Sequence, residues 1–327
     1  MKIIRKIGSY CALLIGFSIS CSNDPGYIKA PSTVNFEPVL AAYNIYRGNP
    51  TDLIPTSGFE RIELSSSLFV NYAQKQRLVK LPPGGEITKL DNGVPSFPNG
   101  TILVKTFYYF KDDRDPNLGK KLIETRLLIK AADQWNVATY VWNDVQTEAH
   151  LKLDGLTKSV SWTTANGQAR TVSYKVPSER DCTTCHQTAA SVMPLGPTLT
   201  NMNKEVQRNG QTINQLLYFQ NKGLLSNFDH HSVPSLPNYL DQQRSIQERG
   251  RAYLEMNCAH CHNPAGFPKA ARKRYDFRYT TPIGTTRILD KKSKIINVIS
   301  SGEMPWIGTT VVDQEGLQIV KTYINSL

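Results

Sequence analysis

Residues 245–262, "SIQERGRAYLEMNCAHCH", predict the architecture of the C-terminal part of the chain. Ser245 and Glu248 have the Ser-x-x-Glu spacing of a capping box, so a helix is expected to begin here and to run toward the cysteines. The stretch ends in the pattern Cys-x-x-Cys-His, formed by Cys258, Cys261 and His262. An Asn-Pro pair follows at once and indicates a turn.

A second copy of this pattern lies earlier, in "DCTTCHQ" at residues 181–187. It consists of Cys182, Cys185 and His186. Cys-x-x-Cys-His is the attachment pattern of c-type haem, in which each thiol forms a thioether with a haem vinyl group and the histidine binds the iron. Two copies predict two covalently bound haems c.

Other uses of paired cysteines fit the spacing less well. A zinc ribbon has its two pairs separated by roughly 15–20 residues, but the gap from Cys185 to Cys258 is far longer and each pair has its own histidine. A thioredoxin-like redox pair opens a helix in a βαβ pattern, which neither copy shows. A structural disulfide remains an alternative in an oxidising compartment.

The first 21 residues, "MKIIRKIGSYCALLIGFSISC", indicate export. A basic start and a short apolar run predict a signal peptide over residues 1–20, too short to be a spanning helix. The small residues before Cys21 resemble a bacterial lipobox, although Ser18 stands where leucine is usual. The resemblance implies cleavage before Cys21, acylation of that residue and a periplasm-facing membrane lipoprotein. The alternative is simple cleavage nearby with Cys21 as a leftover thiol.

The charge of the chain bears on its partners. The formal net charge is +11, and the signal carries three of these charges on Lys2, Arg5 and Lys6, which leaves +8. Four haem propionates lower this further. A mildly basic exported protein favours an acidic redox partner or a membrane surface, and nucleic acid is not an expected partner.

The rest of the chain divides by texture into an α+β multidomain protein. Strand-like runs such as "TILVKTFYYF" predict an N-terminal all-β, sandwich-like domain, with Asn166-Gly167 as a hairpin turn. After Pro177 the texture changes to helix and loop, and both haem motifs fall there. The expected order is a signal peptide (1–20), a lipoprotein tether (21–58), a β-rich domain (59–178), a first haem c segment (179–243) and a haem-binding C-terminal domain (244–327).

The C-terminal segment resembles a class I cytochrome c domain. In such domains a glycine eight residues before the first haem cysteine lets the first helix cross the last one closely, against an aromatic side chain. Gly250 and Tyr323 stand at these positions, and Asp313 is placed to cap the last helix. The last helix has an apolar stripe formed by Leu317, Val320, Tyr323, Ile324 and Leu327.

The same resemblance implies a second iron ligand. Class I domains supply a methionine, usually followed by proline, from a loop before the last helix. "GEMPWIGTT" places Met304-Pro305 there, so Met304 is expected to bind the second iron on the face opposite His262.

The distal ligand of the first haem is left open by the sequence. Met193 lies only seven residues after His186, too few to reach the opposite face of the haem with ease. The weaker candidates are His230, His231 and Met202. The alternative is an iron without any of them.

Longer runs resemble a family of exported bacterial dihaem c-type cytochromes of unassigned physiological role. These runs are "SSLFVNYAQKQRLVKLPPG", "FPNGTILVKTFYYFKDDRDP", "LIETRLLIKAADQW", "YVWNDVQTEA" and "YLEMNCAHCHNPAG". Members are often encoded beside a parallel β-helix protein. The resemblance implies two covalent haems and a partner at the cell envelope, but no substrate.

Two classes of function follow. In the first, the protein is an electron carrier with two six-coordinate irons. In the second, it is a haem-dependent oxidoreductase, peroxidase-like or dehydrogenase-like, with an open distal site at the first haem. Polar residues of the β domain would then line that site: Glu124, Arg126, Glu148 and His150. Charged residues on strands are more often solvated, which favours the electron carrier.

Overall fold

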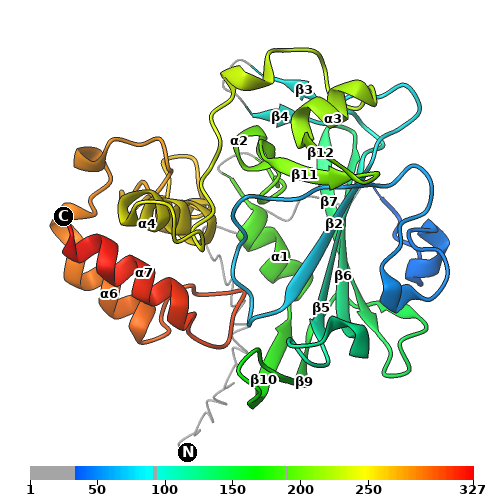
Figure 1. The fold of residues 1–327 in the computed structure, drawn as a ribbon, viewed down its shortest axis with the longest axis horizontal. Helices are drawn as coiled ribbons and strands as arrows, with labels where there is room; N and C mark the ends of the chain where they lie inside the picture. The colour runs from blue at the N-terminus through cyan, green and yellow to red at the C-terminus, as the bar shows by residue number, and fades with distance from the viewer. Residues whose placement is uncertain (1–33, 91–93, 189–190) are drawn as a thin grey trace, which may run out of the picture.

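The computed structural model describes residues 34–90, 94–188 and 191–327. An antiparallel sheet of six strands, in the order β1-β2-β5-β6-β7-β8, forms the N-terminal part. A mainly helical region follows it, with seven α-helices among the described residues. This arrangement confirms the expected fold class of a β-rich part followed by a helical one. Figure 1 shows α4, α6 and α7 gathered on one side of the sheet, with α1 between them and the strands.

The elements have these bounds. The central sheet contains β1 (Glu60–Arg61), β2 (Gln74–Lys80), β5 (Ile102–Phe110), β6 (Lys120–Ala131), β7 (Gln134–Trp142) and β8 (Ala149–Leu151). Three further pairs are β3 (Thr88–Lys89) with β4 (Pro95–Ser96), β9 (Leu156–Thr163) with β10 (Ala169–Val176), and β11 (Glu205–Arg208) with β12 (Gln211–Asn214). The helices are α1 (Glu179–His186), α2 (Leu199–Met202), α3 (Gln215–Asn221), α4 (Ile246–Leu254), α5 (Pro268–Ala271), α6 (Lys292–Ser300) and α7 (Gln314–Asn325).

One face of the sheet is covered by the segment that precedes it. Leu40, Ile45 and Leu53 are buried against a row of apolar strand residues that includes Leu78 and Val104. Burial of such side chains contributes about 1.5–3 kcal/mol each. This part of the expected tether therefore belongs to the folded body.

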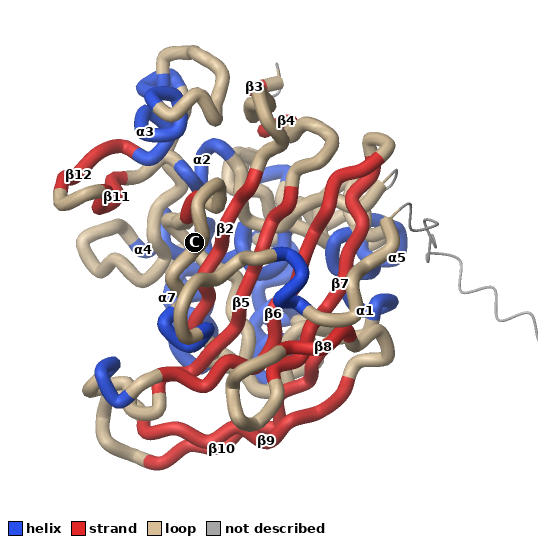
Figure 2. Tube along the Cα trace, turned by 90° about the vertical axis from the view of Figure 1, so that its right-hand side faces the viewer, coloured by secondary structure: helices blue, strands red, loops and turns tan. Residues whose placement is uncertain are grey.

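The opposite face carries two apolar clusters. At one end, Val79 and Leu103 pack with Leu216 and Phe219 of the helical region. At the other end the β9–β10 hairpin forms a second layer, and Figure 2 shows it crossing the end of the sheet. Asn166-Gly167 lies in the turn of this hairpin, as expected, and the strands pair outward from Thr163 and Ala169. Of the Asn-Gly pair, only Gly167 has a positive φ.

The crossing of α4 and α7 is the close contact expected from the sequence. The capping box of Ser245 starts α4, and the side chain of Asp313 caps α7 by accepting from the amide of Gly316 at 3.0 Å. A Cβ atom added to Gly250 would overlap the ring of Tyr323, so the two backbones approach at a position that only glycine allows. A reciprocal pair was not foreseen, in which a Cβ atom on Gly316 would overlap Tyr253.

The predicted apolar stripe of α7 is confirmed except at its last residue. Leu317, Val320, Tyr323 and Ile324 are buried in the C-terminal core. Leu327 is 40% exposed, because α7 ends at Asn325 and the last residue lies beyond the helix. Within residues 34–90, 94–188 and 191–327, no helix has the length and apolar character required to cross a membrane.

Candidate functional site

The first Cys-x-x-Cys-His motif forms the C-terminal part of α1. Ser178 and Asp181 make a capping box that starts this helix three residues after β10 ends. The helix packs on β7, where the sulfur of Cys182 lies 3.8 Å from Oγ1 of Thr139. The first motif therefore packs against strand β7 of the N-terminal sheet.

His186 is oriented by a backbone hydrogen bond. Its Nδ1 donates to the carbonyl of Met193 at 2.8 Å, which leaves Nε2 as the nitrogen that can bind a metal. Burial, followed by the positive charge of Lys105, lowers the pKa of His186 to about 3. The imidazole is therefore neutral at physiological pH, the form that binds iron.

The second motif follows directly from α4. The helix continues into a π-helical segment, η5 (Glu255–Ala259), a feature often found at functional sites. Asn257 holds this segment against the rest of the protein, because its side chain accepts from the amide of Phe69 at 2.8 Å and donates to the carbonyl of Tyr253 at 3.0 Å. The turn after the motif is equally tight, since a Cβ atom on Gly266 would overlap the carbonyl of Cys261.

A cavity of about 580 Å³ lies beside the second motif. Its size is within the range of sites that bind small molecules and cofactors. Cys258, Cys261 and His262 line it, and so does Met304, whose amide donates to the carbonyl of Val298 at 2.8 Å. The remaining walls are largely apolar and include Leu254, Phe267, Phe277, Ile295 and Ile299. The structure brings the expected methionine to the same cavity as the second motif.

The residues around the cavity fit a covalently attached haem. The four motif cysteines are free thiols, and burial raises the pKa of Cys258 to about 12 and that of Cys261 to about 11. His262 is held in contact with Tyr275 and Phe277 at ring distances of 5.6 Å, and its Nδ1 is buried without a partner. Protonated thiols and a neutral imidazole along an apolar wall suit a flat aromatic group that bonds to both sulfurs.

The donor atoms of the motifs do not converge on a point. Among residues 34–90, 94–188 and 191–327, the one group of three or more ligand side chains that lie within 4.8 Å of each other is Asp229, His230 and His231. A structural zinc site requires four ligand atoms around one ion. Among the described residues, Cys258, Cys261 and His262 do not form such a group.

The two motifs lie close together although they are far apart in sequence. Thr184 of the first motif lines the cavity beside the second. The charge of Cys261 contributes to the raised pKa of Cys185, and that of His260 contributes to the lowered pKa of His186. Two groups attached to these motifs would be neighbours.

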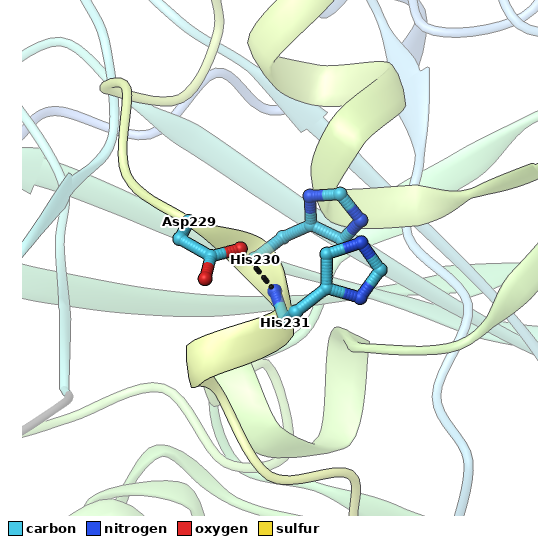
Figure 3. Close-up of side chains that lie close together, drawn as sticks. All are labelled: Asp229, His230 and His231. Carbon is cyan, nitrogen blue, oxygen red and sulfur yellow. Dashed lines mark hydrogen bonds between the residues drawn. The ribbon is translucent and has the colours of Figure 1, made fainter.

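The three weaker distal candidates lie elsewhere. His230 and His231 sit on a short surface turn, η4 (His230–Ser232), with their rings 4.0 Å apart and the amide of His231 donating to Asp229 (Figure 3). Met202 is completely buried in the cluster that contains Leu216 and Phe219. A distal ligand would lie across the haem from His186 rather than in contact with it, so a role for these side chains stays a prediction.

The polar residues considered for a catalytic site fall into two separate groups. Glu124 and Arg126 form an ion pair on the face of the sheet toward the helical region, and the side chain of Glu124 is fully buried. Glu148 and His150 form an exposed pair 2.9 Å apart. The four residues do not line one site.

The signal peptide and Cys21 lie outside the described residues, so the expected export and lipid anchor stay predictions. No protein-family model, curated protein or solved structure matches this chain. The resemblance to exported dihaem cytochromes therefore rests on the sequence runs quoted above.

Proposed function

We propose that this protein is a dihaem c-type cytochrome that transfers electrons in the bacterial cell envelope. The observation that carries the proposal is the pair of Cys-x-x-Cys-His motifs that lie side by side, the second at the wall of a cavity of about 580 Å³ that Met304 also lines. Neighbouring redox groups allow an electron to pass within the chain before it leaves. Cofactors expected here are two haems c.

Each residue has a distinct part in this proposal. The thiols of Cys182, Cys185, Cys258 and Cys261 attach the haems. His186 and His262 provide neutral imidazoles, and when bound, each haem supplies an iron that gains or loses one electron. Met304 provides a thioether, which raises the reduction potential of its haem relative to histidine ligation. The apolar walls exclude water from the second haem.

The mouth of the cavity supports an acidic redox partner. Lys269, Lys273 and Lys294 line the cavity, and all three are exposed. Glu303 also lines it and pairs with Lys294 at 3.9 Å, so Lys269 and Lys273 provide the excess positive charge. Trp306 is 59% exposed, and Nζ of Lys269 lies 5.6 Å from its ring centre. A basic rim around an exposed aromatic side chain favours association with a negatively charged surface and makes the association rate depend on salt.

The attachment roles are tested by removing one pair of thiols at a time. Cys182→Ser/Cys185→Ser and Cys258→Ser/Cys261→Ser are each expected to retain half of the wild-type haem in a pyridine haemochrome assay. Each variant should lose a different reduction potential. A variant that keeps the full haem content contradicts the assignment of its motif, and a wild type without haem contradicts the proposed function.

The second candidate function is a haem-dependent oxidoreductase. The observation in its favour is that His230 and His231 lie on a short surface turn and Met202 is buried in the cluster that contains Leu216 and Phe219, so each of the three candidates already has another structural setting. An open first iron binds carbon monoxide in the reduced protein, whereas a six-coordinate one resists it. Carbon monoxide binding at one haem therefore separates the two functions.

The proposed location is the periplasm-facing side of a membrane, through a lipid anchor on Cys21. A redox protein of the envelope is the proposed partner, and a parallel β-helix protein is the candidate that the family resemblance adds.

A further inference from the structure

Three cations lie directly opposite one another on the face of the sheet that points toward the helical region. Arg77 on β2 pairs with Lys105 on β5, and Lys105 pairs with Arg126 on β6. The next residue in this row is Thr139 on β7, which contacts Cys182 of the first motif. Like charges directly opposite in a sheet are destabilising, so the row requires a compensating group.

A fourth cation joins the row from the neighbouring position of β2. Lys75 pairs with Phe107, a fully buried residue whose ring is surrounded by charge. The side chains of Lys75, Lys105 and Arg126 lie 5.9, 5.2 and 4.4 Å from its centre. These four residues, Lys75, Arg77, Lys105 and Arg126, are called the cation row below.

One carboxylate, that of Glu124, neutralises one member of the row, Arg126. Glu124 accepts from Nε of Arg126 at 3.0 Å and from the hydroxyl of Tyr174 at 2.6 Å. Its side chain is fully buried, so it is committed to these two partners. The negative charge of Asp313 partly offsets the lowering of the pKa of Lys75 by the other cations.

The other three cations meet neutral groups. Lys75 donates to the carbonyl of Ala73 at 3.0 Å, and Arg77 donates to the hydroxyl of Ser67 at 2.8 Å. Nε of Arg77 is buried with no partner. For Lys105, no described residue accepts a hydrogen bond or forms an ion pair with the ammonium.

The arrangement lowers the pKa of two members of the row. Burial, followed by Arg77 and Arg126, lowers the pKa of Lys75 to about 7. Burial and the same neighbours hold the pKa of Lys105 well below its usual range. The four side chains are half-buried, and charges that are partly removed from water without a partner are destabilising, whereas a bound anion offsets their desolvation.

We propose that Lys75, Arg77 and Lys105 form an oxyanion-binding site beside the first haem motif. Two sources offer this chemistry: the propionate carboxylates of the first haem, in which case the inference rests on the proposed function, and a small free oxyanion. Arg126 at one end of the row pairs with Thr139, which contacts Cys182, and the row runs from there across the sheet. A haem attached at Cys182 through its vinyl edge would have its propionates on the opposite edge, where these cations would be able to hold them.

The experiment compares the wild-type holoprotein with Lys105→Met and Lys75→Met, in which methionine keeps the length and removes the charge. Lys80→Met is the matched control, because Lys80 is exposed at the end of β2. Haem content, both reduction potentials and stability to urea are measured. The oxidised proteins are also titrated with sodium nitrite and sodium phosphate while the absorption spectrum is followed.

We expect Lys105→Met and Lys75→Met to retain two haems, to lower one reduction potential and to become less stable. Removing a cation from an uncompensated row would instead relieve repulsion and increase stability. Unchanged potentials together with higher stability, as measured against Lys80→Met, overturn the proposal. The opposite result establishes that the row holds an anion.

The anion titration distinguishes the two sources. A saturable spectral change in the wild type, weakened at least tenfold in Lys105→Met, assigns the site to a free oxyanion. Altered potentials without any response to nitrite or phosphate assign it to the haem carboxylates. A wild type without haem contradicts the proposed function, and phosphate binding by calorimetry then decides the inference alone: binding that Lys105→Met abolishes supports it, and no binding overturns it.

Discussion

The close crossing of α4 and α7 allows a quantitative prediction for Gly250→Ala. The added methyl group would overlap the ring of Tyr323, so the helices must separate or the ring must move. Overpacking costs about 1–3 kcal/mol, and the overlap with both the Cβ atom and the ring of Tyr323 places this substitution in the upper part of that range, at about 2–3 kcal/mol. The better helix propensity of alanine offsets about 1 kcal/mol. We expect a net loss of about 1–2 kcal/mol in the free energy of unfolding.

The assay is urea unfolding of the holoprotein, followed by circular dichroism. With a slope of about 2 kcal/mol per molar urea, the midpoint should fall by about 0.5–1 M. Gly284→Ala is the matched control, because no atom lies within 4 Å of a Cβ atom there, and it should change stability by less than about 0.5 kcal/mol.

A double-mutant cycle tests the cause. In a Tyr323→Gly background both the ring and the Cβ atom that overlap the added methyl group are absent, so Gly250→Ala should stabilise the protein by about 1 kcal/mol and the coupling energy should be about 2–3 kcal/mol. An equal loss of stability in both backgrounds would show that the penalty does not come from the contact with Tyr323.

Three further predictions concern the haems and their surroundings. Met304→His should abolish the weak red absorption band of methionine-ligated ferric haem and lower one reduction potential; an unchanged band excludes Met304 as the ligand. Cys21→Ala should move the protein from the membrane fraction to the soluble fraction with its haem content intact, and continued membrane association would rule out Cys21 as the anchor. Lys269→Glu/Lys273→Glu should slow reduction by an acidic redox protein at least tenfold at low salt, with a smaller effect at high salt, whereas Lys80→Glu should have little effect; equal rates would place the docking surface elsewhere.

The parts of the fold that depend on local sequence could be predicted. The capping box at Ser245, the cap at Asp313 and the contact between Gly250 and Tyr323 each follow from a fixed spacing to a motif or helix end. Met304 is similar, because its place before the last helix brings it to the cavity of the second motif.

The parts that depend on strand register could not be predicted. The cation row combines residues from three strands, and a shift of one residue would turn each side chain to the other face. The closeness of Cys185 to Cys261 has the same origin, since it requires α1 to be placed by β7 and η5 by Asn257. The burial of Leu40 and Leu53 could not be predicted for another reason. A few buried side chains in a segment rich in turn residues produce no periodic pattern.

The mass of the intact, denatured protein shows whether two haems are covalently attached to the chain. Denaturation removes any cofactor that is not covalently bound, so only thioether attachment leaves haem on the polypeptide. We expect a mass excess of two haem groups per chain, reduced to one by Cys182→Ser/Cys185→Ser and also by Cys258→Ser/Cys261→Ser. A purified wild-type protein with the mass of the bare polypeptide, and with zinc bound in its native state, would contradict this expectation.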